Sequence, residues 1–213
     1  MYPSKTTPER IADGLVHAIG LGGFVLACGF LVAMSARVGN AALFGATIIY
    51  ALAILFSISI SFAYHLLPRH DLRLIFRRWD HAAIYLVIAG TFSPLLIISG
   101  GWIADGLLAL IWACALIGVG FKLFANKIDS RWSLASYLGL GWMALLALPS
   151  FWSSLPGAST AGIAMGGLFY TIGTLFYRNK TMRYRYPIWH AFGTLGGLSF
   201  FVAIWLAIAT LAN

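Results

Sequence analysis

The sequence predicts an all-α integral membrane protein, in which seven transmembrane helices form a bundle with the N-terminus in the cytoplasm and the C-terminus outside. Of its 213 residues, 61% are hydrophobic and only 9% are charged, and the mean hydropathy of +0.87 is far above that of a soluble domain. The apolar residues form seven continuous runs, each close to the roughly 20 residues that a helix needs to cross a bilayer. Strands of an outer-membrane barrel would be about ten residues long and would alternate in polarity, so these runs predict helices.

The seven predicted spans are 14–36, 41–66, 80–99, 103–121, 132–151, 161–177 and 186–212. The first is not expected to be a signal peptide, because the residues before it are polar and the apolar run is about twenty residues long. The second and third spans are separated by a polar, basic segment, as are the fourth and fifth and the sixth and seventh. The chain is therefore predicted to consist of a cytoplasmic segment, 1–13, and a single transmembrane domain, 14–213.

The distribution of basic residues gives the orientation. Arg37 is the one basic residue in the connections after the first, third and fifth spans. The other 13 of the 14 lie before the first span or after the second, fourth and sixth, and are Lys5, Arg10, Arg69, Arg73, Arg77, Arg78, Lys122, Lys127, Arg131, Arg178, Lys180, Arg183 and Arg185. The positive-inside rule places these segments in the cytoplasm, where they can also bind anionic headgroups. Topology thus explains the net charge of +8.

Because there is no GxGxxG or Walker sequence, we expect membrane lipids as partners, and neither nucleotides nor nucleic acid.

A layer of ionisable and polar side chains lies at the cytoplasmic edge of the predicted spans. Its members are His17, His65, His81, His190, Asp80 and Ser61. Ionisable groups are costly within a membrane, so the layer predicts a functional site. The alternative is structural: interfacial histidines can bind headgroups or backbone carbonyls, and Asp80 can cap a helix or pair with Arg77 or Arg78.

Imidazoles beside a carboxylate predict a metal site. Catalytic zinc takes three protein ligands and keeps a fourth position open for water. It lowers the pKa of that water towards 7 and polarises a carbonyl group. The layer therefore favours a zinc-dependent hydrolase of an amide or ester.

Several motifs resemble those of the hemolysin III family, the bacterial branch of the superfamily that includes the adiponectin and progestin receptors and the alkaline ceramidases. The strongest is DHAAIYLVIAGTFSP at 80–94, which is similar to the family's third-helix signature. Supporting matches are Glu9, which precedes the first span, with His17 and Gly20 in that span, SFAYH at 61–65 and IWH at 188–190. The resemblance covers all seven spans and implies a multi-pass protein of the bacterial cytoplasmic membrane.

The resemblance also implies a zinc site near the cytoplasmic face. In the family pattern, His65 is one ligand and a His-x-x-x-His pair in the seventh helix supplies two more, while Ser61 and Asp80 support the ligands or the bound water. His190 matches the second histidine of that pair. Tyr186 stands in place of the first.

This departure leaves the third ligand open, because a phenol with an ordinary pKa near 10 is a reluctant ligand. Tyr186 could bind as a phenolate, or His17, His81 or Asp80 could complete the site. The third alternative is a structural cluster without metal.

Two functions are compatible with these residues. The first is a metal-dependent lipid amide or ester hydrolase involved in membrane lipid homeostasis, with Asp80 and Ser61 as its catalytic residues. The second is a non-enzymatic, pore-forming or membrane-integrity role, which the name of the resembled family suggests. A retinal protein is excluded, because the seventh span has no lysine.

Overall fold

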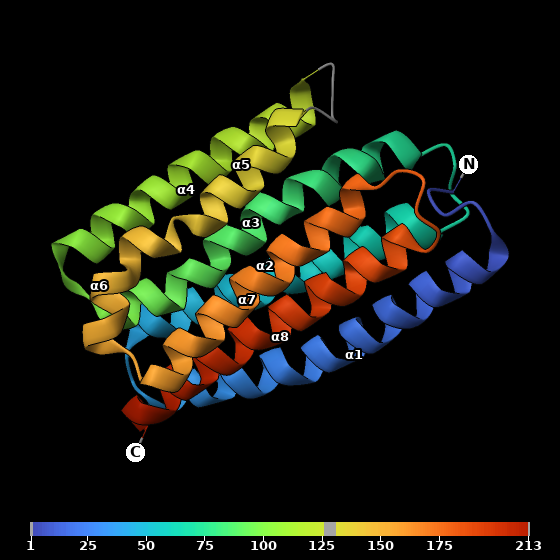
Figure 1. Cartoon of the computed structure of the whole chain (residues 1–213). Coiled ribbons are helices and arrows are strands. Elements are labelled where there is room, and N and C mark those ends of the chain that lie inside the picture. Colours follow the sequence, from blue (N-terminus) through green and yellow to red (C-terminus); the bar gives the residue numbers. More distant parts are fainter. Residues whose placement is uncertain (1, 126–130, 213) are drawn as a thin grey trace.

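The computed structural model describes residues 2–125 and 131–212, which contain eight helices and no strand. The helices are α1 (Thr7–Arg37), α2 (Ala41–Leu66), α3 (Arg73–Ser99), α4 (Gly101–Phe124), α5 (Arg131–Trp142), α6 (Ala144–Ser154), α7 (Gly157–Arg178) and α8 (Arg185–Ala212). Seven stretches are long and apolar enough to cross a membrane, and α5 and α6 together form the fifth, Ser133–Ser154. The predicted seven-span, all-α membrane protein is thus confirmed, and its termini lie at opposite ends of the bundle (Figure 1).

Two helices, α1 and α3, begin seven residues earlier than hydropathy predicts. The helix α1 starts at Thr7 because Thr6 and Glu9 form a capping box: the Glu9 carboxylate accepts from the Thr6 backbone N–H at 2.9 Å, and the Thr6 hydroxyl accepts from the Glu9 N–H at 3.4 Å. The helix α3 starts at Arg73, seven residues before Asp80. Apolar runs mark only the part of a helix within hydrocarbon, and both helices continue beyond it through turns that carry charged residues.

The helix α3 lies at the centre of the bundle. In its most apolar stretch 61% of the residues are buried, against 39% or less in the other spans. It packs mainly against α2 and α4, while α1 packs against α2 and α8, and α7 packs against α8. The helices α4 and α5 lie on the far side of α3 from α1 (Figure 1). The start of α1, the end of α2 and the start of α8 therefore lie next to one another, at the end of the bundle that holds the N-terminus.

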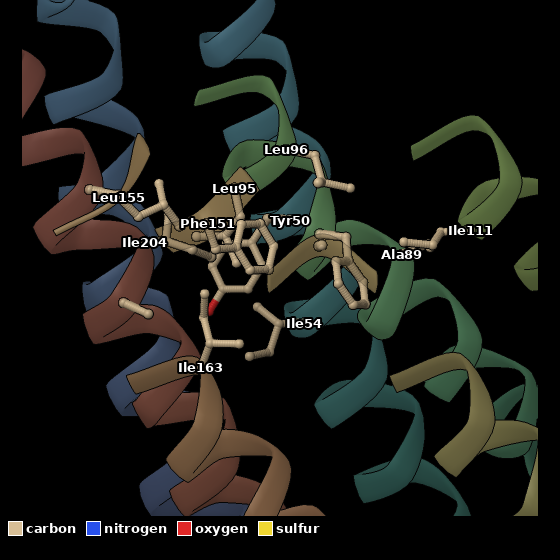
Figure 2. Packing of buried hydrophobic residues seen from close by; sticks show 14 of the residues in the cluster. Tyr50, Ile54, Ala89, Leu95, Leu96, Ile111, Phe151, Leu155, Ile163 and Ile204 are labelled. Atoms are coloured by element: carbon tan, nitrogen blue, oxygen red, sulfur yellow. The ribbon is translucent and has the colours of Figure 1, made fainter. Parts of the chain in front are cut away.

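Large apolar side chains from several helices fill the middle of the bundle. Tyr50 of α2, Leu95 of α3, Phe151 of α6 and Ile204 of α8 are each 1% exposed or less and lie close together (Figure 2). Close packing of this kind is the main force that holds transmembrane helices together.

Gly118 of α4 allows a close approach to Tyr85 of α3. A Cβ atom added at Gly118 would lie 2.5 Å from the Tyr85 ring, whereas one added at Gly120 would meet nothing within 4 Å. We expect Gly118→Ala to destabilise the protein by about 1–3 kcal/mol, the usual cost of overpacking, and Gly120→Ala to have little effect. Thermal unfolding in detergent measures both variants, and equal melting temperatures would contradict this packing.

The connection between α2 and α3 fixes the end of α2. Its last carbonyl groups, which have no partner within the helix, are satisfied by the Arg73 guanidinium, which donates to the carbonyls of Tyr64 and of Leu67, the latter at 2.7 Å. In the same connection, hydrogen bonds from Arg69 lower the pKa of the exposed Asp71 to about 2. The hydrogen bonds from Arg73 to the carbonyls of Tyr64 and Leu67 hold the backbone on both sides of His65.

Candidate metal centre

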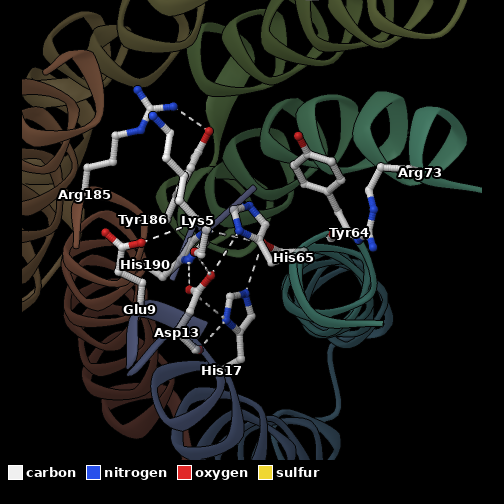
Figure 3. Close-up of polar contacts among 12 residues, drawn as sticks. Lys5, Glu9, Asp13, His17, Tyr64, His65, Arg73, Arg185, Tyr186 and His190 are labelled. Atoms are coloured by element: carbon white, nitrogen blue, oxygen red, sulfur yellow. Dashed lines mark hydrogen bonds and ion pairs between the residues drawn. The ribbon is translucent and has the colours of Figure 1, made fainter. Parts of the chain in front are cut away.

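The Asp13 carboxylate joins two imidazoles from other helices. Its Oδ2 atom lies 3.0 Å from Nδ1 of His65 on α2, and its Oδ1 atom lies 2.6 Å from Nδ1 of His190 on α8. Asp13 is fully buried on α1, His65 is 2% exposed, and the His190 side chain is 12% exposed. All three side chains converge between the helix ends (Figure 3). One carboxylate therefore links α1, α2 and α8.

His17 and Ser61 form the next layer of the centre, about one helical turn deeper. His17 Nδ1 lies 2.8 Å from the backbone carbonyl oxygen of Asp13, and its Nε2 lies 3.1 Å from Ser61 Oγ. Ser61 Oγ also lies 3.4 Å from His190 Nε2, and the Asp80 carboxyl group on α3 lies near Ser61. Ser61 thus lies between the imidazoles and the carboxyl group on α3.

The hydrogen positions in this centre follow from its acceptors. A carboxylate and a backbone carbonyl only accept, so without a bound metal the neutral imidazoles of His17, His65 and His190 are assigned a hydrogen on Nδ1 and a lone pair on Nε2. A metal bound among Asp13, His65 and His190 would displace the hydrogens that face the carboxylate. Ser61 has one hydroxyl hydrogen, and it faces two such lone pairs and the Asp80 carboxyl group. The centre therefore contains more acceptors than donors, a deficit that a bound cation or additional protons would balance.

The donor set fits a divalent metal. Asp13, His65 and His190 each offer one ligand atom, and these atoms lie within 4.8 Å of one another. Two imidazoles and one carboxylate are a ligand set of catalytic zinc, which keeps a fourth position open. Ser61 and Asp80 lie beside this group, where they can contact a molecule in that position.

The structure brings together five of the residues predicted for the site. They are His17, Ser61, His65, Asp80 and His190. They come from α1, α2, α3 and α8 and lie within about one helical turn of one another in depth.

Two further candidates for the third ligand lie next to this group. Tyr186 packs its ring against His65, with centroids 4.9 Å apart, and its hydroxyl accepts a hydrogen bond from Arg185. His81 follows Asp80 directly on α3, so its side chain projects about 100° away around the helix, and its backbone carbonyl accepts from Tyr137. Among the described residues, the group with metal-ligand spacing contains neither of them.

Sequence reasoning missed Asp13. It falls at the end of the polar stretch that precedes the first apolar run, and a helix was not predicted there. The available signal was its spacing from His17: positions i and i+4 share one face of a helix. Once α1 is seen to begin at Thr7, Asp13 lies on the face that His17 presents to α2 and α8.

Comparison with known proteins gives a consistent result. A family model described as "Haemolysin-III related" matches residues 6–205. The chain is 40% identical over 119 residues to the "Hemolysin-3 homolog" of Bacillus subtilis (strain 168), a match that covers 55% of each protein. It is 32% identical over 149 residues to the "Hemolysin-3" of Bacillus cereus, covering 68% of each. The first match thus spans about half the length of the relative.

Proposed function

The chain belongs to the haemolysin-III related family, and from the geometry of its buried centre we propose that it is a membrane-embedded, zinc-dependent hydrolase of a lipid amide or ester, with a role in membrane lipid homeostasis. The observation that carries the proposal is the convergence of Asp13, His65 and His190 beside a second carboxyl group, Asp80, and a hydroxyl, Ser61.

In this proposal each polar residue has a separate role. Asp13, His65 and His190 hold the metal, which when bound lowers the pKa of water and polarises the carbonyl group under attack. Asp80 accepts a proton from the attacking water and returns it to the leaving nitrogen or oxygen. Water adds to the carbonyl carbon, the C–N or C–O bond breaks, and a carboxylic acid is released with an amine or alcohol. Ser61 orients Asp80 and can donate to the oxygen on which negative charge develops.

The depth of the centre supports a lipid substrate. His65 is the penultimate residue of α2, and Asp13 is six residues into α1, or about 9 Å along the helix. We infer that this is the level of the headgroups and linkages of the inner leaflet, where the amide and ester bonds of lipids lie. The basic connections favour the cytoplasmic side for this end of the bundle, and the Bacillus relatives favour the cytoplasmic membrane of a bacterium as its location.

A non-enzymatic role in membrane permeability is the second candidate. The names of the two Bacillus relatives favour it. The centre of the bundle is filled by buried side chains such as Tyr50, Phe151 and Ile204. This packing argues against a pore through a single bundle. Leakage of dye from proteoliposomes that contain the protein, together with no hydrolysis of any lipid amide or ester, would favour this role over the hydrolase.

The proposal is tested with Asp80→Asn, which keeps the size of the side chain but removes its ability to exchange a proton. We expect turnover of a ceramide or phospholipid panel to fall by roughly 10²–10⁴-fold, the usual contribution of a general acid or base, while metal content and melting temperature are retained. His81→Gln, at the adjacent position, is the matched control and should keep full turnover. Undiminished turnover in Asp80→Asn would overturn the assignment of the catalytic acid and base.

A further inference from the structure

The residues before α1 form a strap over the centre, defined here as residues 2–6. Its first residue, Tyr2, contacts side chains of α1 and of the segment around the start of α3. The Tyr2 ring lies beneath the Arg10 guanidinium at 4.8 Å and the Arg73 guanidinium at 5.1 Å, and its edge contacts His70 with centroids 4.9 Å apart. Cation–π contacts of this kind contribute about 0.5–1 kcal/mol each at exposed sites. The strap is thus anchored to the connection that follows His65.

Glu9 anchors the other end of the strap. One of its carboxylate oxygens accepts from the backbone N–H groups of Lys5 and Thr6, at 3.1 and 2.9 Å, and the other accepts from the N–H of Tyr184 at 3.2 Å (Figure 3). Tyr184 has a φ of 59°, a left-handed conformation that is costly for a bulky residue and persists only where neighbours hold it. Glu9 therefore ties the strap to the linker that leads into α8 and His190.

Between these two anchors the strap turns a serine inward. Ser4 is 4% exposed, and its Oγ lies 3.4 Å from Asp13 Oδ2, the oxygen that also faces His65. A buried hydroxyl is costly without a hydrogen-bond partner, and Asp13 is the partner that this structure supplies. The contact is longer than the usual O–H···O distance of about 2.7–2.8 Å, and His65 Nδ1 lies closer to the same carboxylate oxygen, at 3.0 Å.

We propose that Ser4 is a positioning residue for Asp13 and that the strap closes the centre on its cytoplasmic side. That the centre binds a metal rests on the proposed function, whereas closure by the strap does not. Hydrogen bonds to a ligating carboxylate fix its orientation, and loss of such a supporting partner typically weakens metal binding by 10–100-fold. The strap contacts Arg73 through Tyr2 and Asp13 through Ser4, and Glu9 of α1 joins the strap's backbone to the linker before α8. A change at Tyr2 should therefore act on the distant carboxylate through Ser4.

The first experiment measures zinc affinity by competition with a chelator, using the full-length protein in detergent. We expect Ser4→Ala to weaken zinc binding by roughly 10–100-fold, and Ser4→Thr, which keeps the hydroxyl, to retain affinity. Ser153→Ala removes an exposed serine at the opposite end of the bundle and should change nothing. The d–d spectrum of the cobalt-loaded protein should shift in Ser4→Ala alone. Affinities and spectra equal to those of the unchanged protein in Ser4→Ala would overturn the positioning role.

The second experiment tests closure without metal. In the metal-free protein, an imidazole-acylating reagent should modify His190 several-fold faster in Tyr2→Ala than in the unchanged chain, with the site of modification read by peptide mass spectrometry. Melting temperatures of the metal-free variants verify that they are folded. If the unchanged protein binds no zinc, the proposed function fails while this experiment still decides closure, and equal rates of modification would show that the strap does not close the centre.

Discussion

Asp13→Asn is expected to abolish zinc binding. The carboxylate faces two imidazoles at once, one from each oxygen, and an amide offers only one oxygen and no negative charge. The loss should exceed the 10–100-fold that removal of a supporting residue costs, because a ligand itself is replaced. Zinc per chain, determined by mass spectrometry on purified protein without added chelator, measures the effect.

The matched control for this variant is Asp105→Asn, which makes the same chemical change at an exposed position near the start of α4. It should leave zinc content unchanged. His65→Ala and His190→Ala should behave like Asp13→Asn. Zinc bound to Asp13→Asn with unchanged affinity would exclude Asp13 as a ligand and return the third position to the other residues predicted for it.

Adding Tyr186→His to Asp13→Asn is expected to restore zinc binding. Position 186 lies one helical turn before His190 on α8, on the same face, and the Tyr186 ring already contacts His65. A histidine there would complete the His-x-x-x-His pair that the resemblance implies, so the third donor would come from α8 instead of α1. Residues within one network typically couple by about 0.5–3 kcal/mol, and a gain in affinity at the upper end of this range, roughly 100-fold, is expected relative to Asp13→Asn.

The control for this rescue is Tyr186→Phe in the otherwise unchanged chain. Because Asp13 is the proposed ligand, removal of the phenol should leave zinc content as it was. A double variant that binds no more zinc than Asp13→Asn would show that α8 cannot present a ligand from position 186.

The sequence predicted the seven spans because a bilayer requires continuous apolar runs, but it did not predict where the helices end. Charged residues in the first turns of α1 and α3 interrupt the apolar runs, and Thr6 with Glu9 is the local feature that marks the start of α1. The division of the fifth span at Met143 was also not predicted.

The candidate site was predicted in part for a related reason. Depth along each helix follows from the orientation and the helical rise, which placed His17, Ser61, His65 and His190 at one level. Which side chains meet at that level depends on the order in which the helices surround α3, and no residue pattern within one helix specifies that order. Asp13 was missed because its own helix was predicted to begin after it.

The contact between Asp13 and His190 joins residues that are 177 positions apart. Transmembrane helices are inserted before they pack, and chains emerge from the ribosome N-terminus first, so α1 enters the membrane early and α8 enters last. Until α8 arrives, the Asp13 carboxylate has only its partners in the strap, α1 and α2, and the set of three donors is incomplete. The centre therefore forms as the final step of biosynthesis, and a chain that ends before α8 has no means of assembling it.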